Sequence, residues 1–364
     1  MWIVTIWTFM GCGPGTTPGT PLEDSSDTET DTSPVDTSAS SVTSSSETTE
    51  PCDPAPGVPG EDVRMSTTFD GIQRSWVLHL PTDYNCEPLP VLLGIHGYYG
   101  SGDGFQNDTA KLFQHLNDNA YIGIFPDGLP AGPNGYPSWV TSFNDLTTRF
   151  DDGPDGPTCT NAAYDYLAYD NCGPNEETRS CRWGTSCADD AGLFRALIEE
   201  VSEGWSIDPD RVYMTGFSQG GQTVQGLACE LSDILAAVSP HHGFAANGYT
   251  CAPSTPLSLF QVWGLNDNVV NGHEQPSSDG MIYDGADETA LEWAAAQGCS
   301  LTPTPYATVS DGLNGWSCAE HAGCSTGAEV VTCSWDGDHV WGRNNTNGNF
   351  ALEATWAFFE AQSR

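Results

Sequence analysis

The sequence contains very little positive charge. Lys111 is its only lysine, and ten basic residues stand against 49 acidic ones in 364 residues, which gives a formal net charge of -39. Nine of the acidic residues lie in residues 1–60, so the other 40 share the rest of the chain with all ten basic residues. A surface this negative repels phosphate groups, and we therefore expect neither nucleic acid nor an anionic membrane surface as a partner.

Several motifs are also absent from the sequence. No apolar run reaches the ~20 residues that cross a bilayer as a helix. No C-x-x-C pair offers zinc ligands, and no glycine-rich loop with a lysine offers a phosphate cradle. No repeat is visible at periods of about 20–50 residues. We therefore expect one large domain that needs no metal ion and no cofactor.

Cysteine, by contrast, is abundant, and its pattern indicates an exported protein. Apart from Cys12, the cysteines are Cys52, Cys86, Cys159, Cys172, Cys181, Cys187, Cys229, Cys251, Cys299, Cys318, Cys324 and Cys333. An even, scattered set of this kind in an exported chain is typical of a disulfide framework. We expect Cys229 to pair with Cys251, because these two cysteines flank a strand expected at 235–239.

The composition divides the chain into three parts. Residues 1–12 end in Gly11-Cys12 after a short apolar run, which resembles a bacterial lipoprotein export signal with Cys12 as the lipidated residue. An ordinary secreted protein is the alternative. Residues 13–60 consist mostly of Thr, Ser, Pro, Gly, Asp and Glu, and this composition predicts a disordered linker. Residues 61–364 are long enough for one catalytic domain.

The third part of the chain alternates strand-like and helix-like segments. Strands are expected at 74–80, 90–95, 121–125, 212–215, 235–239, 257–263 and 328–335. Helices are expected at 106–119, 189–205, 219–229, 284–297 and 350–361. This alternation predicts an α/β fold, in which a mainly parallel central sheet has helices on both faces.

Residues 126–187 interrupt this alternation. They are rich in Gly, Pro, Asn, Asp and aromatic residues, contain four cysteines and show no clear period. A loop of that length without regular structure is uncommon inside a compact domain. We therefore expect a disulfide-stapled excursion over one end of the sheet.

One serine has the sequence context of a nucleophile elbow. Ser218 lies in GFSQG at residues 216–220, after an expected strand and before an expected helix, as this tight turn requires. Ser325 also matches G-x-S-x-G, but it lies in a cysteine-rich loop and a strand follows it. We therefore expect Ser218 to be a nucleophile and Ser325 to be a turn residue.

A serine nucleophile needs a base and an acid that orients the base. In this type of fold both follow the serine, in loops at the C-terminal ends of strands. Asp267 follows the strand expected at 257–263, and His339 follows the strand that ends at residue 335. We therefore expect Asp267 as the acid and His339 as the base. Weaker candidates are Asp338 for the acid and His273 and His321 for the base.

The oxyanion that forms when a serine nucleophile attacks a carbonyl group needs two N–H donors. The N–H of Gln219 comes directly after Ser218, where the first donor is expected. The loop at 96–102 is rich in glycine and follows the buried strand expected at 90–95. It offers the N–H of Tyr98 as the second donor, although an ordinary glycine-rich turn is the alternative.

Six blocks of the domain occur in an order that is shared with a known family. They are LLGIHGYYGSG, FPDGLP followed by SWV, CRWGTSCADDAGLFRALIEEV, RVYMTGFSQGG, WGLNDNVV and DGDHVWG. In this order they resemble secreted α/β-hydrolase esterases grouped as polyhydroxybutyrate depolymerases and feruloyl esterases. The resemblance covers about residues 61–360. It implies the α/β-hydrolase fold, with Ser218, Asp267 and His339 as the catalytic residues.

The resemblance also implies an activity. It indicates an exported serine carboxylic ester hydrolase that releases feruloyl-type acyl groups from plant polysaccharide. A poly(3-hydroxybutyrate)-type polyester depolymerase and an acetyl-polysaccharide esterase are alternatives. A surface-tethered carbohydrate-binding module on an inactive hydrolase fold is an alternative of a different class. We expect a monomer whose partner is an ester-bearing polymer or oligomer.

Several side chains near the expected site are candidates for binding substrate. Aromatic rings can form a platform for an acyl group or a sugar, although burial in the core is the alternative for Trp139 and Trp183. A histidine at the end of the strand expected at 235–239 could line the same pocket. The candidates are Tyr99, Trp139, Trp183 and His241.

Overall fold

The structure is a computed structural model, and it describes only part of the chain. The described residues are 58–131, 136–140, 153–160, 163–164, 166, 185–343 and 348–364. All of them belong to Glu50–Arg364, the second of the two units into which the chain divides. The export segment expected at 1–12, including Cys12, and nearly all of the linker expected at 13–60 therefore lie outside the described residues.

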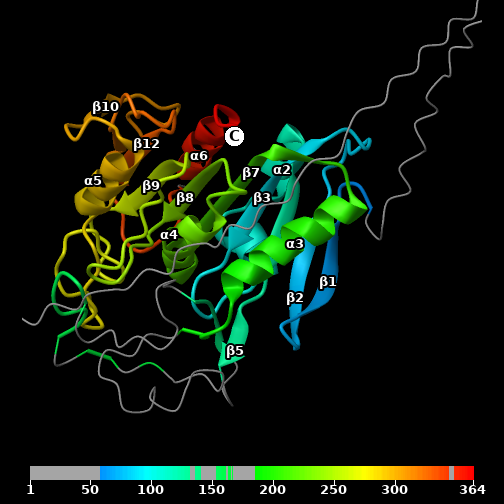
Figure 1. The fold of residues 1–364 in the computed structure, drawn as a ribbon, viewed down its shortest axis with the longest axis horizontal. Coiled ribbons are helices and arrows are strands. Elements are labelled where there is room, and N and C mark those ends of the chain that lie inside the picture. The colour runs from blue at the N-terminus through cyan, green and yellow to red at the C-terminus, as the bar shows by residue number, and fades with distance from the viewer. Residues whose placement is uncertain are drawn as a thin grey trace, which may run out of the picture. The chain divides into compact units, whose positions relative to one another are not determined.

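Ten strands of the described residues form one sheet. In order across the sheet they are β1 (Asp62–Phe69), β2 (Ile72–His79), β4 (Ile122–Pro126), β3 (Leu89–Ile95), β7 (Ile207–Phe217), β8 (Ala237–His241), β9 (Ser258–Gly264), β12 (Val330–Trp335), β11 (Ser317–Glu320) and β10 (Thr304–Tyr306). Each pairing from β4 to β12 is parallel. The pairings toward both edges are antiparallel. The sheet is therefore mainly parallel at its centre, as predicted (Figure 1).

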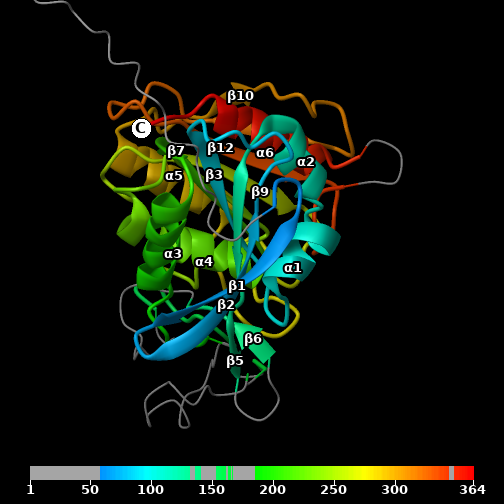
Figure 2. The ribbon, with the colours of Figure 1, turned by 90° about the vertical axis from the view of Figure 1, so that its right-hand side faces the viewer.

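Helices cover both faces of this sheet (Figure 2). They are α1 (Gly102–Gly104), a π-helical turn at Phe105–Thr109, α2 (Phe113–Asn119), α3 (Asp190–Gly204), α4 (Gln219–Leu231), α5 (Ala286–Gln297) and α6 (Phe350–Glu360). Helices α3, α4 and α5 pack into one apolar core, and α2 and α6 pack into another. Val91 and Leu93 of β3 face the first core and Leu92 faces the second, because side chains alternate along a strand. No helix in the described part of the chain has the length and apolar character that crossing a membrane requires.

The segment after β3 differs from the single helix that was predicted at 106–119. The π-helical turn ends at Thr109, and Lys111 then has a φ of 54°. A residue in this left-handed region interrupts a right-handed helix, so α2 begins only at Phe113. Leu112 and Leu116 are nevertheless buried in the core.

Five of the strands were not predicted from the sequence. The first three, β1, β10 and β11, lie at or near the edges of the sheet. The other two, β5 (Leu129–Ala131) and β6 (Tyr136–Ser138), form a separate hairpin. Four of the five are only three or four residues long, too short for a period of two to be recognised. The hairpin belongs to the excursion expected at 126–187, much of which lies outside the described residues.

Every cysteine among the described residues is disulfide-bonded. The pairs between described residues are Cys229–Cys251, Cys299–Cys324 and Cys318–Cys333. The first pair was predicted, and it joins the end of α4 to the loop between β8 and β9. A framework of this kind is typical of proteins that fold in an oxidising compartment.

Asp284, just before α5, is a buried acid that makes stability depend on pH. Its side chain is 1% exposed and accepts hydrogen bonds from the N–H groups of Gly248 and Thr250. Burial raises the pKa of Asp284 from 3.8 to about 6. Between these two pKa values the folded chain therefore binds a proton that the unfolded chain has released. The stability that this bound proton contributes is lost as the pH rises from about 4 to about 6.

Asp284→Asn removes this titration. We compare the free energy of unfolding of the variant with that of the unchanged protein at pH 4 and at pH 7. The difference, variant minus unchanged protein, is expected to be about 1–3 kcal/mol more positive at pH 7 than at pH 4. Urea unfolding at the two pH values measures this difference. A difference that does not change with pH would contradict the prediction.

Candidate active site

Ser218 lies at a sharp bend between β7 and α4. Its backbone has a φ of 58° and a ψ of -124°, which is uncommon for a residue with a side chain. The bend is held by hydrogen bonds on both sides. The N–H of Ser218 donates to the carbonyl of His241 at 3.0 Å, and its own carbonyl accepts from the N–H of Gln222 at 2.9 Å. This is the strand, bend and helix that the sequence predicted.

Two glycines make this bend possible. A Cβ on Gly216 would lie 2.4 Å from the carbonyl oxygen of Gly220, and a Cβ on Gly220 would lie 2.2 Å from that of Ile95. Both distances are far shorter than a van der Waals contact, and both neighbours are backbone atoms, which cannot rotate away. Only glycine fits at these positions.

The structure brings Ser218, His339 and Asp267 together. Ser218 Oγ lies 2.8 Å from His339 Nε2, and His339 Nδ1 lies 2.7 Å from Asp267 Oδ2. The three residues follow β7, β12 and β9, whose C-terminal ends meet at one edge of the sheet. If Nδ1 of His339 donates to the carboxylate, Nε2 is free of hydrogen and can accept the proton of the Ser218 hydroxyl.

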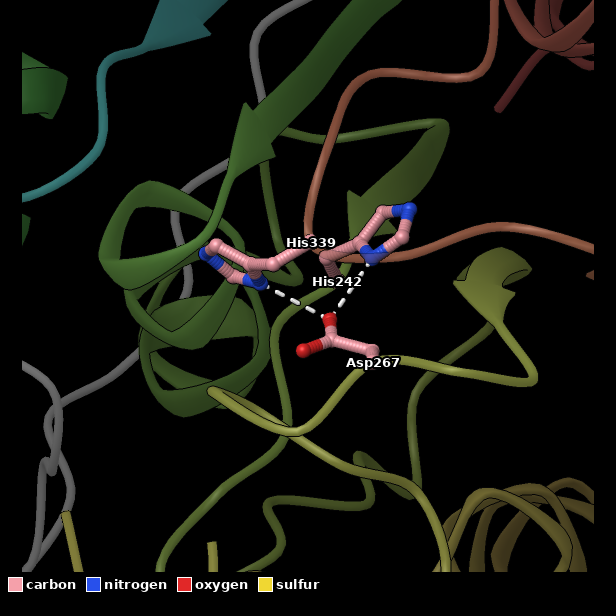
Figure 3. Close-up of side chains that lie close together, drawn as sticks. All are labelled: His242, Asp267 and His339. Carbon is pink, nitrogen blue, oxygen red and sulfur yellow. Dashed lines mark hydrogen bonds and ion pairs between the residues drawn. The ribbon is translucent and has the colours of Figure 1, made fainter. Parts of the chain in front are cut away.

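Asp267 is held as an ionised carboxylate. It is 3% exposed, and its Oδ1 accepts the N–H groups of Val269 and Val270 at 2.8 and 3.0 Å. Its Oδ2 accepts from His242 and His339 (Figure 3). Burial by itself would raise the pKa of Asp267, but the hydrogen bonds from His242 and His339 lower it well below its ordinary range. The carboxylate is therefore charged at neutral pH.

His242 was not predicted to contact the acid. It lies one residue after β8, is fully buried, and its Nδ1 is 2.8 Å from Asp267 Oδ2. Trp335 Nε1 lies 3.4 Å from His242 Nε2. An indole N–H can only donate a hydrogen bond, so Nε2 of His242 is the acceptor and the proton lies on Nδ1, facing the carboxylate. The only sequence signal for this contact is the position of His242 at a strand end.

The neighbouring His241 is a correction to the predicted substrate-binding set. Its side chain is fully buried, and its Nε2 contacts the hydroxyls of Ser239 and Thr355 at 3.1 and 3.0 Å. Its ring stacks on Trp341 with centroids 4.0 Å apart. His241 therefore points away from Ser218, because successive residues at the end of β8 face opposite sides of the sheet.

The side chains of His242, Asp267 and His339 also have the spacing of metal ligands. One ligand atom from each lies within 4.8 Å of the others. A metal would have to displace the Nδ1 proton that Trp335 keeps on His242, and it would break the hydrogen bonds between both histidines and Asp267. The donor set is therefore arranged for hydrogen bonding rather than for a metal ion.

The weaker candidates for acid and base have other positions. Asp338 is exposed. His321 Nδ1 lies 2.8 Å from the carbonyl of Ser300, and His273 Nε2 lies 3.1 Å from the carbonyl of Leu265. Neither histidine has a hydrogen bond to Ser218.

The loop that was expected to provide an oxyanion donor is fixed by His96. His96 Nδ1 donates to the carbonyl of Gly97 at 2.7 Å, and its Nε2 accepts the N–H of Gly128 at 2.9 Å. Burial lowers the pKa of His96 to about 4, so its ring is neutral. Tyr98 and Gln219 line one cavity together with Ser218. Their role as oxyanion donors remains a prediction.

Two cavities open on either side of Ser218 and His339. The larger one, about 520 Å³, is bordered by the loop that contains Tyr98 and Tyr99. The smaller one has a volume of about 250 Å³. Its walls include Tyr98, Tyr166, Gln222, Val269, Val270 and Tyr283. A further cavity of about 540 Å³ contains none of these residues and is lined by residues near the other ends of β8 and β9, such as Ala236 and Leu257.

The predicted aromatic platform is only partly present. Tyr99 is 63% exposed and stacks on Tyr136, with centroids 4.4 Å apart, at the rim of the larger cavity. For Trp139 the structure shows the alternative, burial, because its side chain is fully buried and its Nε1 donates to the carbonyl of His96 at 2.9 Å. It supports the loop from below and does not reach the cavity. Trp183 lies outside the described residues.

Comparison with known proteins extends these observations. No family model matches the chain. Feruloyl esterase B of Piromyces equi is 26% identical over 290 residues, which are 77% of this chain and 45% of that protein. A probable feruloyl esterase C of Aspergillus niger is 27% identical over 293 residues, 79% of this chain and 84% of that protein. The chain is therefore similar in sequence to feruloyl esterases over about three quarters of its length.

A solved structure supports the fold of this chain. The structure of an acetyl xylan esterase from Aspergillus awamori is 13% identical and has a TM-score of 0.54. The match covers 82% of this chain and 99% of that one. This chain therefore has the α/β-hydrolase fold, as the six sequence blocks implied. The chain spans less than half the length of the Piromyces equi protein.

Proposed function

We propose that the chain is an exported serine carboxylic ester hydrolase with Ser218 as nucleophile, His339 as base and Asp267 as the acid that orients the base. The observation that carries this proposal is the unbroken series of hydrogen bonds from Ser218 Oγ through His339 to Asp267. Similarity to feruloyl esterases over about three quarters of the chain supports a carboxylic ester hydrolase.

The proposed reaction has two halves. Ser218 Oγ attacks the carbonyl carbon of the ester while His339 Nε2 takes the hydroxyl proton, and the N–H groups of Gln219 and Tyr98 stabilise the oxyanion. His339 then gives this proton to the leaving alcohol, and the acyl group stays on Ser218. A water molecule attacks the acyl-enzyme, its proton goes to His339, and the acid is released as the proton returns to Ser218.

The two cavities favour an ester that joins a small aromatic acid to a saccharide. The cavity of about 250 Å³ has three tyrosines in its wall, and the hydroxyl of Tyr166 is held by Asp279 at 2.7 Å. Planar tyrosine rings suit a planar aromatic acyl group. The cavity of about 520 Å³ is wider and borders the exposed Tyr99, which suits a sugar chain. We therefore propose feruloyl-type esters of plant polysaccharide as the substrate.

The disulfides support export. All described cysteines are paired, and such pairing is stable in oxidising compartments. We further propose that Cys12 is lipidated and tethers the domain to a membrane surface through residues 13–60, and that the domain acts as a monomer. Mass spectrometry of the exported protein tests the lipid directly, because an unlipidated Cys12 in the mature protein would contradict the tether.

The function is tested with a fluorophosphonate and three substrates. We expect a covalent adduct on the peptide that contains Ser218, and kcat/KM for methyl ferulate at least about 10-fold above that for hydroxybutyrate oligomers and acetylated xylan. Faster turnover of hydroxybutyrate oligomers or of acetylated xylan would indicate the respective alternative esterase. Absence of both adduct and turnover would indicate a binding protein on an inactive hydrolase fold.

A further inference from the structure

His242 is a second histidine on the acid, and the reaction described above gives it no part. His242 Nδ1 and His339 Nδ1 lie 2.8 and 2.7 Å from the same oxygen, Asp267 Oδ2 (Figure 3). The two rings are nearly perpendicular, at 89°, with centroids 5.7 Å apart. They approach the oxygen from different directions and do not compete for space.

The backbone is adapted to hold the His242 ring. His242 has a φ of 50°, in the left-handed region that residues with side chains seldom adopt. Its N–H donates to the carbonyl of Val262 at 2.8 Å, which holds this conformation. A Cβ on Gly264 would lie 2.9 Å from His242 Cε1. The glycine at 264 therefore leaves space for the His242 ring that the side chain of any other residue at 264 would fill. Strained positions of this kind cluster at functional sites.

The ring of His242 donates to the acid without adding charge. Burial lowers the pKa of His242 more than the hydrogen bond and charge of Asp267 raise it, and a nearby His339 lowers it further. The neutral ring has its proton on Nδ1 because Trp335 donates to Nε2. When His339 becomes positively charged during the reaction, Asp267 therefore balances one positive charge and not two.

We infer that His242 is a positioning residue for the proposed ester hydrolysis: its Nδ1–H fixes Oδ2 of Asp267, and Asp267 thereby keeps His339 aligned with Ser218. Oδ1 is already fixed by two backbone N–H groups. With four donors the buried carboxylate cannot rotate about its Cβ–Cγ bond unless it loses hydrogen bonds. A small loss of alignment at the base costs rate, because proton transfer depends on geometry. The inference rests on the proposed function.

The test compares two replacements of His242 with p-nitrophenyl acetate as substrate. His242→Leu removes the donor, and we expect kcat to fall about 10- to 100-fold with KM changed less than about twofold. His242→Asn keeps an N–H near the position of Nδ1 and should retain most of kcat. His241→Gln is the matched control, since His241 is equally buried at the same strand end but does not contact Asp267.

A double-mutant cycle separates positioning from a general loss of structure. In an Asp267→Asn background, His242→Leu should lower kcat by less than about twofold, because the residue through which it acts is already altered. An effect as large as in the unchanged protein would overturn the inference. Should His242→Leu not fold, His242→Gln replaces it, because its amide extends toward Trp335 and not toward Oδ2.

The outcomes for function and positioning are distinct. If His242→Leu folds and keeps its kcat while the unchanged protein turns over substrate, the positioning role of His242 is overturned and the proposed function is not. A loss of kcat in His241→Gln as large as in His242→Leu would also overturn the positioning role. Absence of turnover and of a Ser218 adduct in the unchanged protein would overturn the proposed function, and the inference with it.

Discussion

Ser218→Ala is expected to lower kcat/KM for methyl ferulate about 10⁴- to 10⁶-fold, with little change in the melting temperature. Alanine removes the oxygen that is proposed to attack the ester, while the proposed oxyanion donors and the cavity walls remain. The Oγ has one hydrogen-bond partner in the site, His339, at 2.8 Å. Its removal therefore costs activity rather than stability.

Ser325→Ala is the matched control for this prediction. Ser325 occupies the other G-x-S-x-G pattern of the chain, and its Oγ contacts the carbonyl of Gln297 at 3.4 Å. We expect kcat/KM of this variant to stay within about twofold of the unchanged value. A Ser218→Ala protein with more than about one hundredth of the original activity would contradict the nucleophile assignment.

Arg74→Met is expected to lower the free energy of unfolding by about 3–5 kcal/mol, because it leaves a buried carboxylate without its partner. Arg74 is 3% exposed and lies 2.9 Å from Asp190, which is fully buried at the start of α3. Burial raises the pKa of Asp190, and the charge of Arg74 opposes this rise. Without Arg74 the acid must either stay charged in an apolar environment or bind a proton, and both cost stability.

The control for this loss is an ion pair on the surface. Arg195 lies 2.7 Å from Asp233, but both side chains are much more exposed, and Arg195→Met should cost less than about 1 kcal/mol. Urea unfolding of the two variants under the same conditions gives the comparison. Equal losses in both variants would contradict the view that the Arg74 pair is special because it is buried.

The buried ion pair of Arg74 and Asp190 also contacts residues that support the candidate active site. Asp190 Oδ2 accepts the N–H of Val140 at 2.7 Å, next to Trp139, whose Nε1 donates to the carbonyl of His96. The guanidinium of Arg74 lies 5.8 Å from the centre of the Trp139 ring. We therefore expect activity of Arg74→Met to decline as well, through the loop that contains Tyr98.

The centre of the sheet was predictable from the sequence because its strands are buried on both faces. Strand β3 then consists of continuous apolar residues, and β9 is buried along its whole length with only Ser258 and Gln261 as polar residues. The glycines around Ser218 add a steric requirement that few other sequences satisfy. Asp267 and His339 could be located because each follows such a strand. The hydrogen bonds of His339 with Ser218 and with Asp267 are observed, whereas the catalytic roles of these residues await the experiments above.

The parts that were not predictable depend on contacts between distant segments. Short strands such as β10 and β11 are specified by their pairing with β12 rather than by their own pattern. His241 and His242 are identical in type and adjacent, so only the register at the end of β8 decides which of them meets Asp267. Trp139 lies in a stretch without a period, so the sequence left open whether it is buried or lines the site.

The bend at Ser218 tolerates no side chain at Gly216 or Gly220, whereas part of the wall of each cavity comes from loops that follow other strands, such as those that contain Tyr99 and Val269. A library for laboratory evolution can therefore vary Tyr99, Val269 or Tyr166 to admit different esters without touching the reacting atoms. The same library applied at 216 and 220 would return almost entirely misfolded clones. Substrate range and chemistry are thus separately adjustable in this scaffold.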